Sequence, residues 1–225
     1  AEVKAEEVGS YLLLNEVYHV MIEYNSFFSV DLEEIMSKSE QNLHLLVNEE
    51  KLNKIYALMK NYYSDISQPE YKSFEELQGE LFAKYQVSED IRYSYRIVYQ
   101  LSQMAHVFAI ATKDYLSIER LVIKNYNEIK PIPPQTVNEQ FYNLQILYII
   151  ANIYFRKKSF NESIVTLKEL DQVLKKEKKL EQYFRPLYTC LYSLNLNYLG
   201  NHQEAKDILI ELSNRKVKYE TFAML

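Results

Sequence analysis

The chain has 225 residues, of which 48% are hydrophobic and 25% charged, so it can bury a sizeable core and is not a disordered chain. Only 3 glycines and 5 prolines are present, which is too few for the many turns of a sheet-rich fold. The net charge of −5 argues against direct binding to nucleic acid, because that needs a dominant basic surface.

No run of about 18 apolar residues is present, so we expect no membrane-spanning helix and no membrane partner. The single cysteine, Cys190, rules out an internal disulfide. It lies among apolar residues with no histidine nearby in the sequence, which favours a buried thiol over a nucleophile. We therefore expect a cytoplasmic protein. Because the chain begins at Ala1 and ends in the apolar run 221–225, we expect that it is cut from a longer protein.

In the first half of the chain, apolar residues at helical spacing predict four helices, over 4–25, 31–46, 49–63 and 73–84. Asp31 with Glu34, and Ser73 with Glu76, are capping-box pairs that predict where the second and fourth of these helices begin. The polar residues 64–72 predict a connection. The region 64–88 departs most from the rest of the pattern, so it is either a degenerate repeat or the junction between two sub-arrays.

From residue 89 the pattern becomes regular and predicts six long helices, over 89–111, 114–129, 137–156, 160–177, 185–199 and 202–217. The proline-rich segment 131–134 separates the second from the third of them, because proline cannot continue a helix. Pro186 is expected in the first turn of its helix, where a missing N–H is tolerated. Ser159 and Glu162 predict another capping box.

A helix–turn–helix pattern recurs in this second half, at 154–170 and again at 196–212. The first unit carries Leu147, Ile150, Ala151 and Tyr154 on one helix and Phe160, Ser163, Leu167 and Leu170 on the next. The following unit carries Tyr192, Ser193, Leu196 and Gly200, then Ala205, Leu209 and Leu212, and a weaker earlier unit carries Ala105, Ala109, Tyr115, Ile118 and Val122. These residues resemble the tetratricopeptide repeat.

The resemblance covers residues 100–215 and departs from the standard repeat. The interval is 45 residues from Ile118 to Ser163 and 42 from Ser163 to Ala205, against the roughly 34 of the standard repeat. Tryptophan is also absent. The chain is therefore similar to irregular members of the superfamily, such as the peptide-sensing domains of some bacterial regulators and helical-repeat proteins of bacteria. The resemblance implies an all-α fold, an α-solenoid of stacked antiparallel helix pairs that forms a right-handed superhelix.

We expect three parts: N-terminal helical hairpins over 1–63, an irregular connection with a short helix over 64–88, and helical repeats over 89–225 that continue the N-terminal part. A helix pair has two apolar faces, and stacking the next pair covers the face that it leaves open. Such a stack curves, and its concave surface is lined by the first helix of each pair, where partners usually bind.

The predicted concave surface carries a polar stripe, because residues three or four positions apart share one side of a helix. The candidate binding residues are Gln145, Tyr148, Asn152 and Arg156 on one helix, with Gln100 and Gln103 before it and Asn197 and Tyr198 after it. Amides can bond to a peptide backbone, and arginine can pair with a carboxylate. The resemblance implies that Asn152 holds a peptide backbone. A polar, solvated helix face gives the same pattern, so both interpretations stay open.

No arrangement of residues predicts catalysis. The three glycines are isolated and cannot form a phosphate-binding loop, and no Gly-x-Ser-x-Gly elbow occurs. Glu16 and His19 have the Glu-x-x-His spacing of di-iron bundles, but the second copy that such a site needs is missing. We therefore expect no metal, no cofactor and no enzymatic activity.

The leading hypothesis is a non-catalytic scaffold that binds a protein or peptide on its concave face. The alternative is a ligand-sensing or peptide-sensing regulatory domain of a bacterial transcription regulator, whose DNA-binding segment is absent from this chain. Self-association is a further hypothesis: exposed tyrosine and leucine side chains at the ends would pair two chains into a homodimer, or would mark missing repeats.

Overall fold

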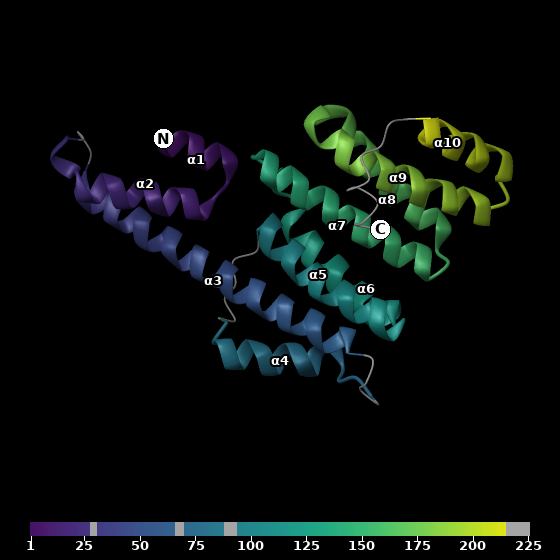
Figure 1. Cartoon of the computed structure of the whole chain (residues 1–225), viewed down its shortest axis with the longest axis horizontal. Helices are drawn as coiled ribbons and strands as arrows, with labels where there is room; N and C mark the ends of the chain where they lie inside the picture. The colour runs from purple at the N-terminus through teal and green to yellow at the C-terminus, as the bar shows by residue number, and fades with distance from the viewer. Residues whose placement is uncertain (28–30, 66–69, 88–93, 215–225) are drawn as a thin grey trace.

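The computed structural model describes residues 1–27, 31–65, 70–87 and 94–214, and within these ranges it contains helices and no strands (Figure 1). The α-helices are α1 (Glu2–Val8), α2 (Tyr11–Glu23), α3 (Leu32–Ser64), α4 (Phe74–Tyr85), α5 (Tyr95–Thr112), α6 (Tyr115–Ile129), α7 (Val137–Arg156), α8 (Phe160–Lys176), α9 (Lys178–Tyr198) and α10 (His202–Asn214), with one 3-10 turn, η1 (Asn25–Phe27). The predicted all-α class is confirmed. None of the described helices has the length and apolar content needed to cross a bilayer.

Asp31 and Ser73 cap the starts of α3 and α4, as predicted, but Glu34 and Glu76 do not return the second bond of a capping box. Asp31 Oδ1 accepts hydrogen bonds from the backbone N–H groups of Glu33 and Glu34, at 2.9 and 3.4 Å. Ser73 Oγ accepts one from the N–H of Glu76, at 3.2 Å. These bonds satisfy N–H groups that have no partner within the first turn of the helix.

The capping box predicted at Ser159 and Glu162 is wrong, because the Ser159 side chain accepts no bond from the first turn of α8. A full capping box lies instead before α7. There Thr136 Oγ1 accepts from the N–H of Glu139 at 3.1 Å, and the Glu139 carboxylate accepts from the N–H of Thr136 at 3.3 Å. The start of α7 at 137 is therefore fixed by a pair that the sequence pattern did not single out.

Two of the predicted helix boundaries in the first half are also wrong. The segment 4–25 is two helices, because Gly9 has a φ of 66° and ends α1, and the Ser10 side chain then caps α2. Conversely, 31–46 and 49–63 form the single helix α3. Asn48 and Glu49 look like a polar break in the sequence, but both are buried in the structure.

In the second half, α9 begins at Lys178 rather than 185, so Pro186 lies well inside the helix and not in its first turn. The early start follows from Leu180 and Phe184, which are buried in the main core and extend the apolar side of α9. Pro186 has no N–H to donate to the preceding turn, and its ring is buried. The end predicted for the helix over 202–217, which is α10, lies outside the described residues.

Successive helices pack against one another in antiparallel order, and α3, α5, α7 and α9 lie side by side (Figure 1). Each of these four contacts the helix that follows it, and α6 and α8 also contact the next pair through α7 and α9. One large core cluster runs from α3 to α9, and a smaller one joins Ala151, Leu167 and Leu191 of α7, α8 and α9. The arm formed by α2 and the first half of α3 extends away from this stack (Figure 1).

Candidate functional site

Polar and aromatic side chains of α5 and α7 meet on one face of the stack. We call this the α5/α7 face and define it by Tyr99, Gln103 and His106 of α5 and Tyr142, Tyr148, Asn152 and Arg156 of α7. The α5 members are four and three positions apart, so they form one stripe of that helix. All are half-buried except Arg156, which is exposed. They therefore lie between the core and the solvent, where a partner can reach them.

Arg156 is the last residue of α7, and it lies at one end of the α5/α7 face. Its Nε donates a long hydrogen bond of 3.4 Å to Asn152 Oδ1. Burial, together with the smaller effect of the Arg156 charge, lowers the pKa of His106 to about 4, so His106 is neutral at pH 7. Burial raises the pKa of Tyr148 to about 12, with Cys190 of α9 adding to this rise and Arg156 opposing it. The guanidinium is thus the charged group among neutral hydrogen-bonding and aromatic neighbours.

The other end of the α5/α7 face is aromatic. The rings of Tyr99 and Tyr142 stack with centroids 5.2 Å apart, and the Arg96 guanidinium carbon lies 5.7 Å from the Tyr142 ring centroid. Arg96 is held in place by an ion pair with Glu49 of α3, which is 6% exposed. This ion pair fixes α5 against α3 beneath the face, so the aromatic end has a rigid support.

The structure brings Gln103, Tyr148, Asn152 and Arg156 of the predicted site together on the α5/α7 face. Gln100 and Gln145 are each 6% exposed, so they are buried and not available on this face. The Gln100 side-chain amide donates to Asn53 Oδ1 at 2.7 Å and to the Glu49 carbonyl at 3.3 Å, so it joins α5 to α3.

Asn197 and Tyr198 lie elsewhere, at the turn between α9 and α10. Asn197 Oδ1 and His202 Nδ1 are 2.8 Å apart in a hydrogen bond. Tyr198 stacks on Phe160 with ring centroids 5.0 Å apart and meets Phe155 edge-on. Neither side chain makes a described contact with the α5/α7 face.

Tyr99, His106 and Tyr142 belong to the face but were not singled out from the sequence. The spacing of Tyr99, Gln103 and His106 is the signal that could have found two of them, because it matches the rule used for the α7 stripe. Tyr142 follows from the same rule, because it lies three positions before Gln145 of the α7 stripe.

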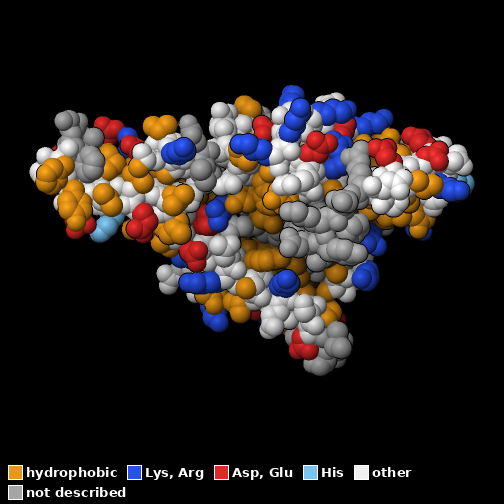
Figure 2. All heavy atoms as spheres, turned by 45° about the horizontal axis from the view of Figure 1, so that its top comes forward, with side chains coloured by type: hydrophobic (Ala, Val, Ile, Leu, Met, Phe, Trp, Pro, Cys, Tyr) orange, Lys and Arg blue, Asp and Glu red, His pale blue; other side chains and the backbone are white. Residues whose placement is uncertain are grey.

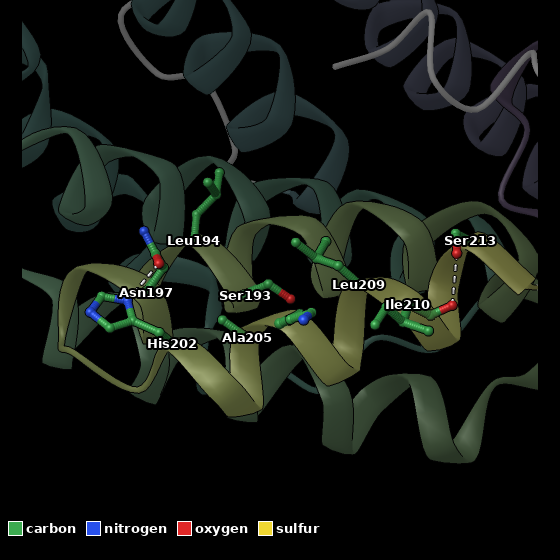
Figure 3. A pocket seen from close by; sticks show the side chains of 9 residues that line it. Ser193, Leu194, Asn197, His202, Ala205, Leu209, Ile210 and Ser213 are labelled. Carbon is green, nitrogen blue, oxygen red and sulfur yellow. Dashed lines mark hydrogen bonds between the residues drawn. The ribbon is translucent and has the colours of Figure 1, made fainter.

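A separate pocket of about 420 Å³ opens between α9 and α10 (Figure 3). Its lining includes Ser193, Leu194, Ala205, Leu209 and Ile210, and Figure 3 shows the Asn197–His202 pair at one end and Ser213 at the other. The pocket is mainly apolar, with hydrogen-bonding groups at its ends.

Hydrophobic side chains also reach the surface of the arm formed by α2 and α3 (Figure 2). Leu12, Leu13, Val20, Met36 and Leu43 are each between 45% and 58% exposed there. The exposure of these side chains does not test the predicted homodimer, which stays a hypothesis.

The titratable residues do not converge on a metal site or nucleophile in the described part of the chain. His19 lies 3.8 Å from Glu23 on the surface of α2, and no cluster of three His, Cys, Asp or Glu placed to hold a metal occurs among the described residues. Burial raises the pKa of the half-buried Cys190, which disfavours its thiolate. Comparison with protein-family models, curated proteins and solved structures found no match.

Proposed function

We propose that this chain is a non-catalytic α-solenoid scaffold of tetratricopeptide-like helix pairs, and that it binds an extended peptide or protein segment on the α5/α7 face. The packing order supports the architecture, since α3, α5, α7 and α9 lie side by side and each pairs with its successor. A repeat stack requires this nearest-neighbour arrangement. In such a stack the layer formed by α3, α5, α7 and α9 is the concave one.

The environment of Arg156 is the observation that carries the proposal. Its guanidinium is exposed, and among the described residues its two terminal nitrogens have no hydrogen-bond or ion-pair partner. A carboxylate of the partner can accept two parallel hydrogen bonds from such a group. Attraction at this point is local, because the chain as a whole is acidic.

The neighbours of Arg156 suit the rest of an extended segment. The Asn152 amide can both donate to and accept from a peptide backbone. Neutral His106 offers one donor and one acceptor, and Tyr148 and the Tyr99–Tyr142 pair offer broad, rigid contact area. Along the face, the amide and imidazole groups can therefore bind the backbone of the partner, and the tyrosine rings can pack against its side chains. At one end, Arg156 can bind a negatively charged group.

The proposal is tested with random 12-residue peptides displayed on phage and selected on the folded protein, followed by fluorescence polarisation of the selected peptides. We expect the peptides to carry a carboxylate. We expect Arg156→Ala to weaken binding about tenfold or more, because hydrogen bonds to charged groups contribute about 1.5–3 kcal/mol. Asn152→Ala should weaken the same peptides.

The matched control is Arg120→Ala, which removes another exposed arginine, on α6. It should leave the affinity unchanged. If all three variants bind the selected peptides like the wild type, the α5/α7 face is not the binding surface and the proposal fails.

A further inference from the structure

The α7 side of the α5/α7 face lies next to α9, and two contacts fix the register of these helices. Successive helices are antiparallel, so α7 and α9 run parallel, and they are in contact. Phe141 of α7 meets Phe184 of α9, 43 positions later, with ring centroids 5.4 Å apart. Burial raises the pKa of Tyr148, and Cys190, 42 positions later, adds to the rise, which places the thiol near this tyrosine.

The register places a leucine beside the amide of the proposed site. Leu194 lies one turn beyond Cys190 on α9, and Asn152 lies one turn beyond Tyr148 on α7. Because the helices are parallel, Leu194 comes opposite Asn152. Leu194 stands at the edge of the pocket between α9 and α10, where Figure 3 shows it pointing away from Ala205 of α10. The α5/α7 face therefore continues onto α9.

The continuation is apolar. We call it the α9 strip and define it by Tyr183, Cys190 and Leu194, which are seven and four positions apart and so share one side of α9. Tyr183 is 52% exposed, Leu194 is 45% exposed and Cys190 is half-buried. Burial raises the pKa of the Cys190 thiol, so it is uncharged at pH 7. An apolar side chain that covers the α9 strip removes apolar area from water, which favours binding.

We propose that the segment bound on the α5/α7 face continues onto α9 and places a bulky apolar side chain against Cys190 and Leu194. This inference rests on the proposed function, because the same segment pairs its carboxylate with Arg156. Arg156 lies one turn, about 5.4 Å, from Asn152, and Leu194 lies about 8–10 Å across from Asn152. An extended chain rises about 3.3 Å per residue, so the apolar residue lies about two to four positions from the carboxylate.

The peptides selected by phage display on the wild-type protein give the first test. We expect them to carry leucine, isoleucine, methionine or phenylalanine about two to four positions from an aspartate or glutamate. Leu194→Asp should weaken these peptides at least tenfold, because it brings a carboxylate into the apolar contact. Replacing the apolar residue of the peptide by alanine should weaken binding about fivefold or more. The two changes together should cost less than the product of their separate factors, because they remove the same contact.

The thiol of Cys190 gives a second readout on the wild-type protein, since it is the single cysteine of the chain. We expect a saturating selected peptide to slow alkylation of Cys190 by N-ethylmaleimide about fivefold or more, because the apolar side chain covers the thiol. The matched control is the same peptide with its apolar residue replaced by alanine, also at a saturating concentration. It keeps the carboxylate for Arg156 and should protect Cys190 less.

A control variant and the Arg156 variant separate the possible outcomes. Leu116→Asp places the same charge at a 70% exposed leucine of α6 and should leave the affinity unchanged. If Arg156→Ala weakens the peptides but Leu194→Asp does not, or if the peptides leave the alkylation of Cys190 unchanged, this inference is overturned and the proposed function stands. If Arg156→Ala has no effect, the proposed function fails and this inference fails with it.

Discussion

Replacing Leu167 and Leu209 by alanine tests the proposed repeat at two corresponding positions that differ in burial. In the proposed repeat Leu167 and Leu209 occupy the same position, but the first is 0% exposed and the second 44% exposed. Leu167 packs with Leu191 and Ala151 in the smaller core cluster. Leu209 lines a pocket of about 420 Å³. The same chemical change should therefore have unequal effects.

The magnitudes follow from burial. Leu167→Ala removes fully buried methyl groups and leaves a cavity, so we expect the free energy of unfolding to fall by about 3 kcal/mol. Leu209→Ala removes side-chain area that is nearly half exposed, and we expect a loss of about 1 kcal/mol. For a chain of this size these losses correspond to falls in Tm of about 6–12 °C and about 2–4 °C.

Urea unfolding, followed by far-UV circular dichroism and by the fluorescence of the 21 tyrosines, measures both losses. Coincidence of the two signals would show that unfolding is two-state and that the free energies can be compared. Equal losses for the two variants, or a larger loss for Leu209→Ala, would refute the reasoning, because they would mean that Leu209 is covered in solution.

Three further predictions concern titratable and charged groups. His106 has a pKa of about 4 in the folded chain, below its unfolded value, so the stability that it contributes is present above pH 6.5 and is lost as the pH falls towards 4. We expect the wild type to lose about 2 kcal/mol more than His106→Gln between pH 7 and pH 5, measured by urea unfolding. Arg96→Met leaves the buried Glu49 unpaired and should cost about 3–5 kcal/mol, and adding Glu49→Leu should recover most of it. Cys190, whose pKa is raised by burial, should react with Ellman's reagent at pH 7.5 more slowly than a cysteine in an unfolded peptide.

Each of these predictions has a result that would contradict it. Parallel pH profiles for the wild type and His106→Gln would show that His106 titrates as in the unfolded chain. A double variant as unstable as Arg96→Met alone would mean that the cost is lost packing and not an unpaired charge. Thiol reaction at the unfolded rate would place Cys190 in water.

Local signals made much of the fold predictable. The bounds of α7 were predicted as the structure has them, because a long apolar pattern ends there at a basic turn. The caps at Asp31 and Ser73 depend on neighbouring backbone groups alone. The continuity of α3 was not predictable, since Glu49 stays inside the helix through its ion pair with Arg96, far along the chain.

The candidate site was predictable within one helix and less so between helices. Tyr148, Asn152 and Arg156 could be grouped by spacing because helical periodicity fixes their side. Gln100 could not be placed, because its burial depends on Asn53 of α3. Asn197 and Tyr198 are consecutive, and consecutive residues of a helix point about 100° apart, so they were not able to continue one stripe together.

The central claim is that a partner segment lies on the α5/α7 face, and the most direct measurement is an NMR titration of the side-chain amides with a selected peptide. We expect the amide signals of Gln103 and Asn152 to shift on binding, while that of the buried Asn195 stays in place. Shifts confined to Asn197 at the α9/α10 pocket, with Gln103 and Asn152 unmoved, would contradict it.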